Sequence, residues 1–241
     1  MFETFFIKPL YNVFVYLIGV MPVGDVGLAI IAMTLIIRIL FYPAFAASIR
    51  TQMGMQAAQA ELDEINKKYK DSSEERARHT LELYKSKKIR PFAGFVAILV
   101  QLPIFIALYF ALFRESLPKI AENLLYSFVQ VPQHINLNFL GFINLVAAHN
   151  ILLSLLVGAL QYVVAYLSMA RIKPGLASLS KERQVAQKMQ HNMMLYMFPA
   201  LIAIIAYTLP AAVGIYFAAT NLISIGQEWL IRRDILNNKL S

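Results

Sequence analysis

Apolar residues are concentrated in five long runs along the chain. Each run approaches the roughly 20 mostly apolar residues that are needed to cross the hydrocarbon core of a bilayer. The connections between the runs carry most of the charged residues. We therefore predict an all-α membrane protein with a core bundle of five transmembrane helices, at residues 26–49, 91–113, 151–170, 193–209 and 211–231.

The N-terminal segment, residues 1–25, is apolar but is not clearly a span. Between Phe2 and Val20 it contains Glu3, Lys8 and Asn12. From these residues alone, the segment is either a sixth span or an amphipathic helix that lies in the membrane interface. It has neither the basic N-terminal region nor the small-residue cleavage site of a secretory signal.

Lys and Arg residues are divided unevenly between the connections. Residues 50–90 contain ten of them and residues 171–192 contain five, whereas residues 114–150 contain two. Cytoplasmic loops of membrane proteins carry an excess of Lys and Arg. We therefore predict a cytoplasmic helical hairpin at 50–90, an outer loop at 114–150, a cytoplasmic loop at 171–192 and a short cytoplasmic tail at 232–241.

The expected hairpin contains a signal for the start of a helix. Ser72 and Glu75 have the spacing of a capping box, in which a serine side chain accepts a hydrogen bond from a backbone N–H three residues later. Apolar residues recur at helical spacing on both sides of this point, and they would form a modest seam between two helical arms: Met55, Leu62, Ile65 and Tyr69 before it, and Leu81 and Tyr84 after it.

Composition and charge narrow the function classes. Hydrophobic residues make up 59% of the chain and charged residues 15%, against about 25% charged residues in soluble domains. The net charge of +8 fits cytoplasmic loops near anionic lipids better than nucleic-acid binding, since no aromatic-basic motif is present. The absence of cysteine excludes disulfides, thiolate zinc sites and iron–sulfur clusters. We find no catalytic, metal-binding or phosphate-binding motif, so no enzyme activity or cofactor is predicted.

Arg38 is the only Arg or Lys residue well inside a predicted span. An arginine at the bilayer centre costs about 2.5–3.5 kcal/mol on insertion scales, and it does not lose its proton to avoid that cost. We therefore predict that it faces a wet, polar groove in the bundle. The alternative is that it bonds carbonyls in a packed bundle. Besides Arg38, the predicted groove lining comprises Thr34 and Tyr42, one turn on either side, and Gln101, Thr220 and Asn221 from other spans.

Several short motifs follow one another in a specific order. They are Gly27 through Arg38 to Tyr42-Pro43, then Leu83-Tyr84-Lys85, Arg90-Pro91 and Gly94, then Gln101 to Phe105 and Ala107 to Tyr109, and finally Phe198-Pro199, Pro210, Tyr216, Asn221-Leu222 and Gln227. In order, spacing and five-span layout, the chain resembles the YidC family of membrane protein insertases from about Lys8 to Arg232. It departs from the family's pattern at Arg90, Phe95 and Ala212, and a glutamine that many members have near Ala165 stands one turn earlier, at Gln161.

The resemblance implies a membrane protein insertase and chaperone of the bacterial cytoplasmic membrane that works without ATP or a redox cofactor. Nascent membrane proteins would enter a hydrophilic groove that is open to the cytoplasm and to lipid, with Gln161 as a further lining residue. The cytoplasmic hairpin would meet a Sec-type translocon, the ribosome or targeting factors. Residues 1–25 would form an interfacial helix on the outer face. A large outer domain, a leading anchor span and a long basic tail are not expected.

Two other functions compete with this interpretation. The first is a small-solute or anion transporter or channel that uses Arg38 as an anion site, but its expected inverted repeats and paired broken helices are not visible in the sequence. The second is a structural assembly factor that binds other membrane proteins.

Overall fold

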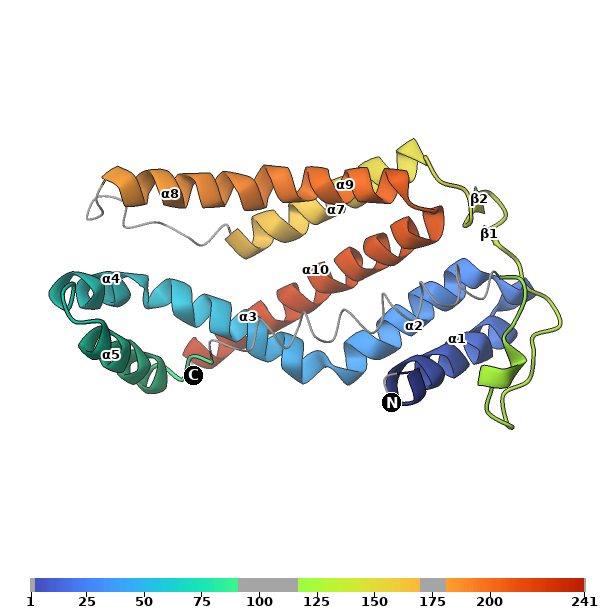
Figure 1. Ribbon diagram of the computed structural model, residues 1–241, viewed down its shortest axis with the longest axis horizontal. Helices are drawn as coiled ribbons and strands as arrows, with labels where there is room; N and C mark the ends of the chain where they lie inside the picture. Colours follow the sequence, from blue (N-terminus) through green and yellow to red (C-terminus); the bar gives the residue numbers. More distant parts are fainter. Residues whose placement is uncertain (1–2, 91–116, 170–180, 241) are drawn as a thin grey trace.

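The computed structural model describes residues 3–90, 117–169 and 181–240, and these are mainly helical (Figure 1). The predicted second span, at 91–113, lies outside the described residues. In chain order the elements are η1 Glu3–Ile7, α1 Lys8–Val20, η2 Pro22–Gly24, α2 Val26–Leu40, α3 Tyr42–Ala57, α4 Gln59–Lys68, α5 Ser73–Ser86, η4 Glu122–Leu124, β1 Asn138–Phe139, β2 Ile143–Asn144, α7 Ile151–Met169, α8 Lys181–Asn192, η6 Met193–Met197, α9 Phe198–Thr208 and α10 Ala211–Leu240.

Two segments in the described part of the chain are long and apolar enough to cross a membrane unaided. They are Ile151–Ser168 in α7 and Lys188–Thr208, which runs from α8 through η6 into α9. Only 22% and 17% of these segments is buried inside the protein, so most of their apolar surface is left for lipid. The bent pair α2 and α3 is a third candidate. The structure thus supports an all-α membrane protein with two to three candidate spans, and the five-span layout remains a prediction.

The predicted first span, 26–49, is two helices rather than one. The axes of α2 and α3 meet at an angle of 67° with only Phe41 between them. The sequence places Pro43 just after the break. Proline has no N–H for the helical ladder and restricts the residue before it, so the helix ends ahead of it. The helix therefore breaks at Phe41, two residues before Pro43.

The ends of the last two predicted spans also differ from the sequence boundaries. Residues 181–192 of the predicted cytoplasmic loop are helical and continue directly into η6 and α9. The wider turn of η6 comes just before Pro199, which cannot donate the next ladder hydrogen bond. α10 continues to Leu240, through most of the predicted tail. α10 is not among the strongly apolar candidate spans, because it carries several polar side chains.

Close helix contacts hold α7 between α9 and α10. A Cβ atom at Gly158 of α7 would lie 2.9 Å from the Cβ of Ala203 on α9. A Cβ at Gly214 of α10 would lie 2.6 Å from Leu153 of α7. Each glycine therefore allows a helix approach that a larger residue would prevent. In turn, α10 packs against α2, which brings the first and last parts of the chain together.

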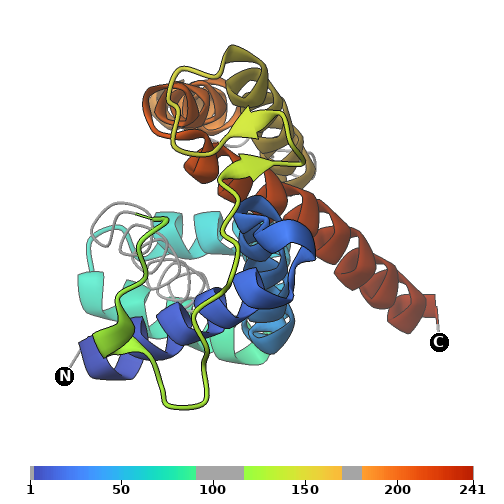
Figure 2. The ribbon, with the colours of Figure 1, turned by 90° about the vertical axis from the view of Figure 1, so that its right-hand side faces the viewer.

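The segment 117–150 joins several helix ends at one end of the molecule, opposite α4 and α5 (Figures 1 and 2). Its first part is bound to α1: the Asn12 side chain donates to the carbonyl of Leu124 at 2.8 Å and accepts from the N–H of Tyr126 at 2.6 Å. Its last part satisfies the start of α10, since Ala211 and Ala212 donate to backbone carbonyls of this segment at 2.8 and 2.9 Å. Asn12, a polar residue in the apolar N-terminal run, thus has a structural role.

Asp25 connects the start of α2 to the short hairpin formed by β1 and β2. One carboxylate oxygen accepts from the N–H groups of Gly27 and Leu28 at 2.8 and 3.0 Å, which caps α2. The other oxygen accepts from the N–H of Leu140 at 2.8 Å. A Cβ at Gly27 would lie 2.3 Å from the Phe139 ring, so the hairpin can dock here only against glycine.

Replacement of Asp25 should therefore loosen this end of the protein. We expect Asp25→Ala to lower the free energy of unfolding by about 2 kcal/mol, through loss of the cap and of the Leu140 hydrogen bond. Asp25→Asn should have a smaller effect, because its carbonyl can still cap α2 while its NH₂ group opposes the N–H of Leu140. Thermal unfolding in detergent measures both. Wild-type stability of Asp25→Ala would show that the carboxylate does not hold the hairpin.

α4 and α5 pack against each other as the two arms of the region 50–90 (Figure 1). α5 begins at the predicted position, with the Ser72 hydroxyl accepting from the N–H of Glu75 at 3.3 Å. The Tyr69 and His79 rings stack with centroids 4.4 Å apart, and Lys87 pairs with Glu61 across the arms. Leu81 does not join the expected seam, since it is 56% exposed.

Candidate functional site

Arg38 lies in the last turn of α2, and not at the middle of a continuous helix. The bend after Leu40 places it at the carbonyl end of α2, where the helix dipole favours a positive charge. The bend also turns Phe45 of α3 back toward it: the guanidinium carbon lies 4.2 Å from the centre of the Phe45 ring. This distance is that of a cation–π contact.

Gln227 of α10 is the hydrogen-bond partner of Arg38. The Arg38 Nη1 donates to Oε1 of Gln227 at 3.3 Å, and Nε2 of Gln227 donates to the backbone carbonyl of Arg38 at 3.1 Å. Tyr216, also on α10, lies within electrostatic reach of the guanidinium. Tyr216 and Gln227 are eleven residues apart and so share one face of the helix. We call Arg38, Phe45, Tyr216 and Gln227 the Arg38 cluster.

The Arg38 cluster is buried and contains no acid. Arg38 is 7% exposed, Gln227 8% and Tyr216 1%. Among the described residues, no carboxylate forms an ion pair with Arg38. The nearby acid of α10, Glu228, is bound to Arg232 four residues later. The cluster therefore holds a buried positive charge that neutral groups solvate but do not neutralise.

Glu228 and Arg232 form a second buried polar contact in α10. Arg232 donates both to the Glu228 carboxylate and to the backbone carbonyl of Leu167 in α7. The side chains are 9% and 19% exposed. The pair thus joins α10 to the end of α7.

The other predicted groove residues differ in their burial and contacts. Thr34 is buried, and its hydroxyl donates to the carbonyl of Ile30 in its own helix at 2.7 Å. Tyr42 is half-buried and lies beyond the bend, so helical spacing no longer relates it to Arg38. Gln161 is half-buried on α7, and none of the described contacts joins it to Arg38. Gln101 lies outside the described residues.

Thr220 and Asn221 are buried in α10, at 9% and 4% exposure. Within the described part of the chain, the Asn221 Nδ2 has no hydrogen-bond partner, whereas the Thr220 hydroxyl interacts with the Tyr216 side chain one turn earlier. Because neighbouring residues of a helix point about 100° apart, the two side chains leave α10 in different directions. Thr220 shares the face of Tyr216 and Gln227, whereas Asn221 points to another side. The Asn221 Nδ2 is therefore a buried polar atom that a ligand or water could bind.

Phe45, Tyr216 and Gln227 are the cluster residues that the predicted groove lining lacks. Gln227 contributes to the resemblance noted above, and its helical spacing from Tyr216 was the available signal for its place on this face. Phe45 carried no such signal, because only the bend between α2 and α3 brings it over the guanidinium. The close approach of α2 and α10 is what forms the cluster.

Comparison with known sequences identifies the family. The chain matches the family described as "60Kd inner membrane protein" over residues 19–239. The Membrane protein insertase YidC of Oceanobacillus iheyensis is 30% identical over 241 residues, which covers 98% of this chain and 86% of that protein. The proteins of the same description from Histophilus somni and Cellvibrio japonicus are each 28% identical over 96% and 95% of the chain.

The chain spans 37% and 36% of the lengths of the Histophilus somni and Cellvibrio japonicus proteins, respectively. Against the Oceanobacillus iheyensis protein it spans most of the length. The match includes α2, α3, α7, α9 and most of α10, and therefore the whole Arg38 cluster. On these comparisons, the chain belongs to the YidC family of membrane protein insertases.

Proposed function

We propose that this protein inserts newly made membrane proteins into the bacterial cytoplasmic membrane. Its relatives carry the name of insertases. The observation on which the proposal rests most is the buried Arg38 charge, which is bound by Gln227 and Phe45 and has no acidic partner among the described residues. A buried charge of this kind attracts acidic or carbonyl-rich parts of a chain that must enter the membrane.

In the proposed mechanism, the substrate replaces weak ligands of Arg38. The bond from Nη1 to Gln227 is 3.3 Å long and its acceptor is neutral. A carboxylate can accept two parallel hydrogen bonds from a guanidinium and carries the opposite charge, whereas the Gln227 amide offers one neutral acceptor. An acidic segment would therefore compete with Gln227 for Arg38. Thr34, Tyr42, Gln161, Thr220 and Asn221, with Gln101, would line the hydrophilic groove that receives this segment from the cytoplasm.

The apolar part of a substrate would leave along the outer surface of the bundle. α7 exposes Leu152 at 82% and Leu155 at 63%, and α9 exposes Ile204 at 59%. A transmembrane segment that slides along such a surface exchanges contacts with protein for contacts with lipid tails, which are equally apolar. No external energy source is needed for this step. The arms α4 and α5 would meet the nascent chain, a Sec-type translocon, the ribosome or targeting factors.

The orientation of the protein is a testable part of this proposal. We expect Ser72, between α4 and α5, to be cytoplasmic and Gln133 to be outside, because of the ten-to-two difference in basic residues between their two segments. Single cysteines at these positions in the cysteine-free chain can be labelled with an impermeant thiol reagent on intact cells. Position 133 should react and position 72 should not, and the opposite pattern would reverse the topology.

Reconstitution tests the function itself. Purified protein in liposomes should protect a short single-span substrate from added protease, while protein-free liposomes should not. The same liposomes loaded with a halide-sensitive dye report anion flux. Protection without flux supports an insertase. Anion flux without protection would identify a transporter or channel and refute the proposal.

A further inference from the structure

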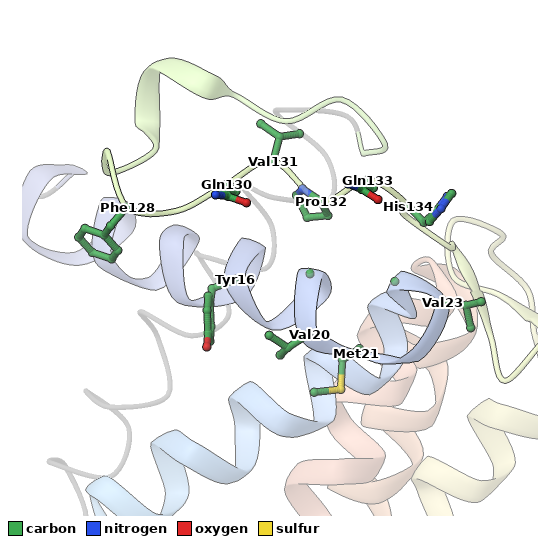
Figure 3. A pocket seen from close by; sticks show the side chains of 12 residues that line it. Tyr16, Val20, Met21, Val23, Phe128, Gln130, Val131, Pro132, Gln133 and His134 are labelled. Atoms are coloured by element: carbon green, nitrogen blue, oxygen red, sulfur yellow. The ribbon is translucent and has the colours of Figure 1, made fainter.

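A pocket lies between the second half of α1 and the loop 128–134 (Figure 3), and none of the residues that line it belongs to the Arg38 cluster. Its volume is about 480 Å³, within the range of about 300–1,000 Å³ of small-molecule sites. Tyr16 and Val20 of α1 line it from one side, and Phe128, Val131 and Pro132 line it from the loop. None of the described lining residues is Lys, Arg, Asp or Glu, which favours an apolar or uncharged ligand over a free ion.

The pocket is continuous with an apolar stripe on the exposed side of α1 and η1. Phe5, Val13, Tyr16 and Val20 are 72%, 41%, 58% and 53% exposed, and at 3.6 residues per turn they fall on one side of the helix. The opposite side is buried in the protein. An exposed apolar stripe on a membrane-associated helix faces acyl chains. Because Tyr16 and Val20 belong to both the stripe and the pocket, the pocket opens toward lipid.

The remaining polar groups of the pocket match the ester region of a lipid. Gln130, Gln133 and His134 line it, and their amide and ring N–H groups can donate hydrogen bonds. A phospholipid presents ester carbonyls, which accept such bonds, directly above its acyl chains. Apolar walls with uncharged donors thus suit the glycerol-ester end of a lipid better than its charged headgroup.

We propose that this pocket binds one acyl chain of an outer-leaflet phospholipid, with the ester carbonyls held by Gln130, Gln133 or His134. The proposal rests on the outer placement of α1 and of the loop 128–134, which is part of the proposed function. The bound lipid fills the space between α1 and this loop. It thereby fixes the depth of α1 in the interface.

Fluorescence quenching by lipids with brominated acyl chains tests the site. The native tryptophan is removed by Trp229→Phe, and Phe128→Trp places a reporter in the pocket. Titration of brominated phosphatidylcholine into the protein in detergent should quench this reporter saturably, at one lipid per protein. The matched control is Phe142→Trp in the same background: this position, 77% exposed next to β2, does not line the pocket. Its quenching should be weak and should not saturate.

Gly19→Leu provides a variant that fills the pocket. A Cβ at Gly19 would meet only the Pro132 ring, at the ordinary contact distance of 3.8 Å, and Gly19 lines the pocket, so a larger side chain there would occupy pocket space. It should abolish the saturable quenching at position 128 and leave the unfolding temperature unchanged. The absence of saturable quenching in the parent, or its survival in Gly19→Leu, would overturn the proposal. Displacement of the lipid by an added single-span substrate peptide would overturn it too, by identifying a substrate site.

The outcome is separable from that of the proposed function. The liposome insertion assay can succeed while the reporter at position 128 shows no saturable quenching, which refutes only the lipid site. If impermeant labelling instead places Gln133 in the cytoplasm, the outer-leaflet assignment is wrong even where saturable quenching occurs.

Discussion

Arg38→Ala is expected to slow the insertion of substrates with acidic tails at least about tenfold, which corresponds to about 1.4 kcal/mol. Two opposite charges 4 Å apart attract with about 4 kcal/mol at an effective dielectric constant of 20, so loss of a fraction of that attraction suffices. Substrates with neutral tails should be affected less. The measurement is protease protection in liposomes, with matched substrates that differ only in the charge of the tail.

Two variants separate the charge of Arg38 from its packing. Arg38→Lys should retain substantial activity, because it keeps the positive charge while losing the planar contact with Phe45. Gln227→Glu should slow insertion about as much as Arg38→Ala, because it places an acid beside the guanidinium that competes with the substrate. Arg50→Ala serves as the control for loss of an exposed positive charge in α3.

Unfolding temperatures in detergent decide what a loss of activity means. All four variants should fold and accumulate. If Arg38→Ala prevents folding while Arg38→Lys does not insert substrates, Arg38 is a packing residue and the electrostatic mechanism is refuted. Equal losses for acidic and neutral substrates would likewise exclude attraction by charge.

Glu228→Gln is expected to destabilise the protein by about 3 kcal/mol, the largest stability effect that we predict. The change leaves Arg232 without its ion-pair partner at a site where both side chains are largely buried. Removal of one member of a buried pair leaves an uncompensated charge, which costs about 3–5 kcal/mol. The hydrogen bond from Arg232 to the Leu167 carbonyl offsets part of this cost. Thermal or denaturant unfolding in detergent measures the change.

A double-mutant cycle isolates the pair. Arg232→Gln alone should also destabilise the protein, and the combination with Glu228→Gln should cost clearly less than the sum of the two single changes. Arg233→Gln is the matched control, since Arg233 is exposed and lies 5.7 Å over the Trp229 ring instead of against an acid. Additive effects of Glu228→Gln and Arg232→Gln would mean that the two residues act independently.

Local patterns in the sequence were sufficient for the parts of this fold that depend on neighbours in the chain. The Ser72 cap requires only a serine and an N–H three residues later, and α5 begins there. Pro43 ends α2 because of its own ring and missing N–H. The position of Leu81 relative to the seam was not predictable in the same way. Two short helices can pack with different sides in contact, and the side that α5 uses depends on which residues of α4 face it.

The Arg38 cluster likewise combines a feature that the sequence predicts with contacts that only the fold creates. The cost of burying a guanidinium is a property of the residue, so Arg38 could be singled out from the sequence. Its partners could not, because Phe45 reaches the guanidinium only through the 67° bend. Gln227 is 189 residues away from Arg38 in the chain and reaches it only because α2 packs against α10. Likewise, only the fold brings the N–H of Leu140 to the second carboxylate oxygen of Asp25.

The sequence by itself determined that the chain is helical, apolar enough for a membrane and marked by one buried arginine, because run length, composition and residue chemistry are local properties. The tertiary structure alone decided that Arg38 is bound by a neutral amide and a ring, and that Glu228 is occupied by Arg232. It also decided that one segment, 117–150, joins the ends of α1, α2 and α10. These contacts depend on how helices far apart in the chain approach one another, and side-chain packing across those interfaces sets that approach.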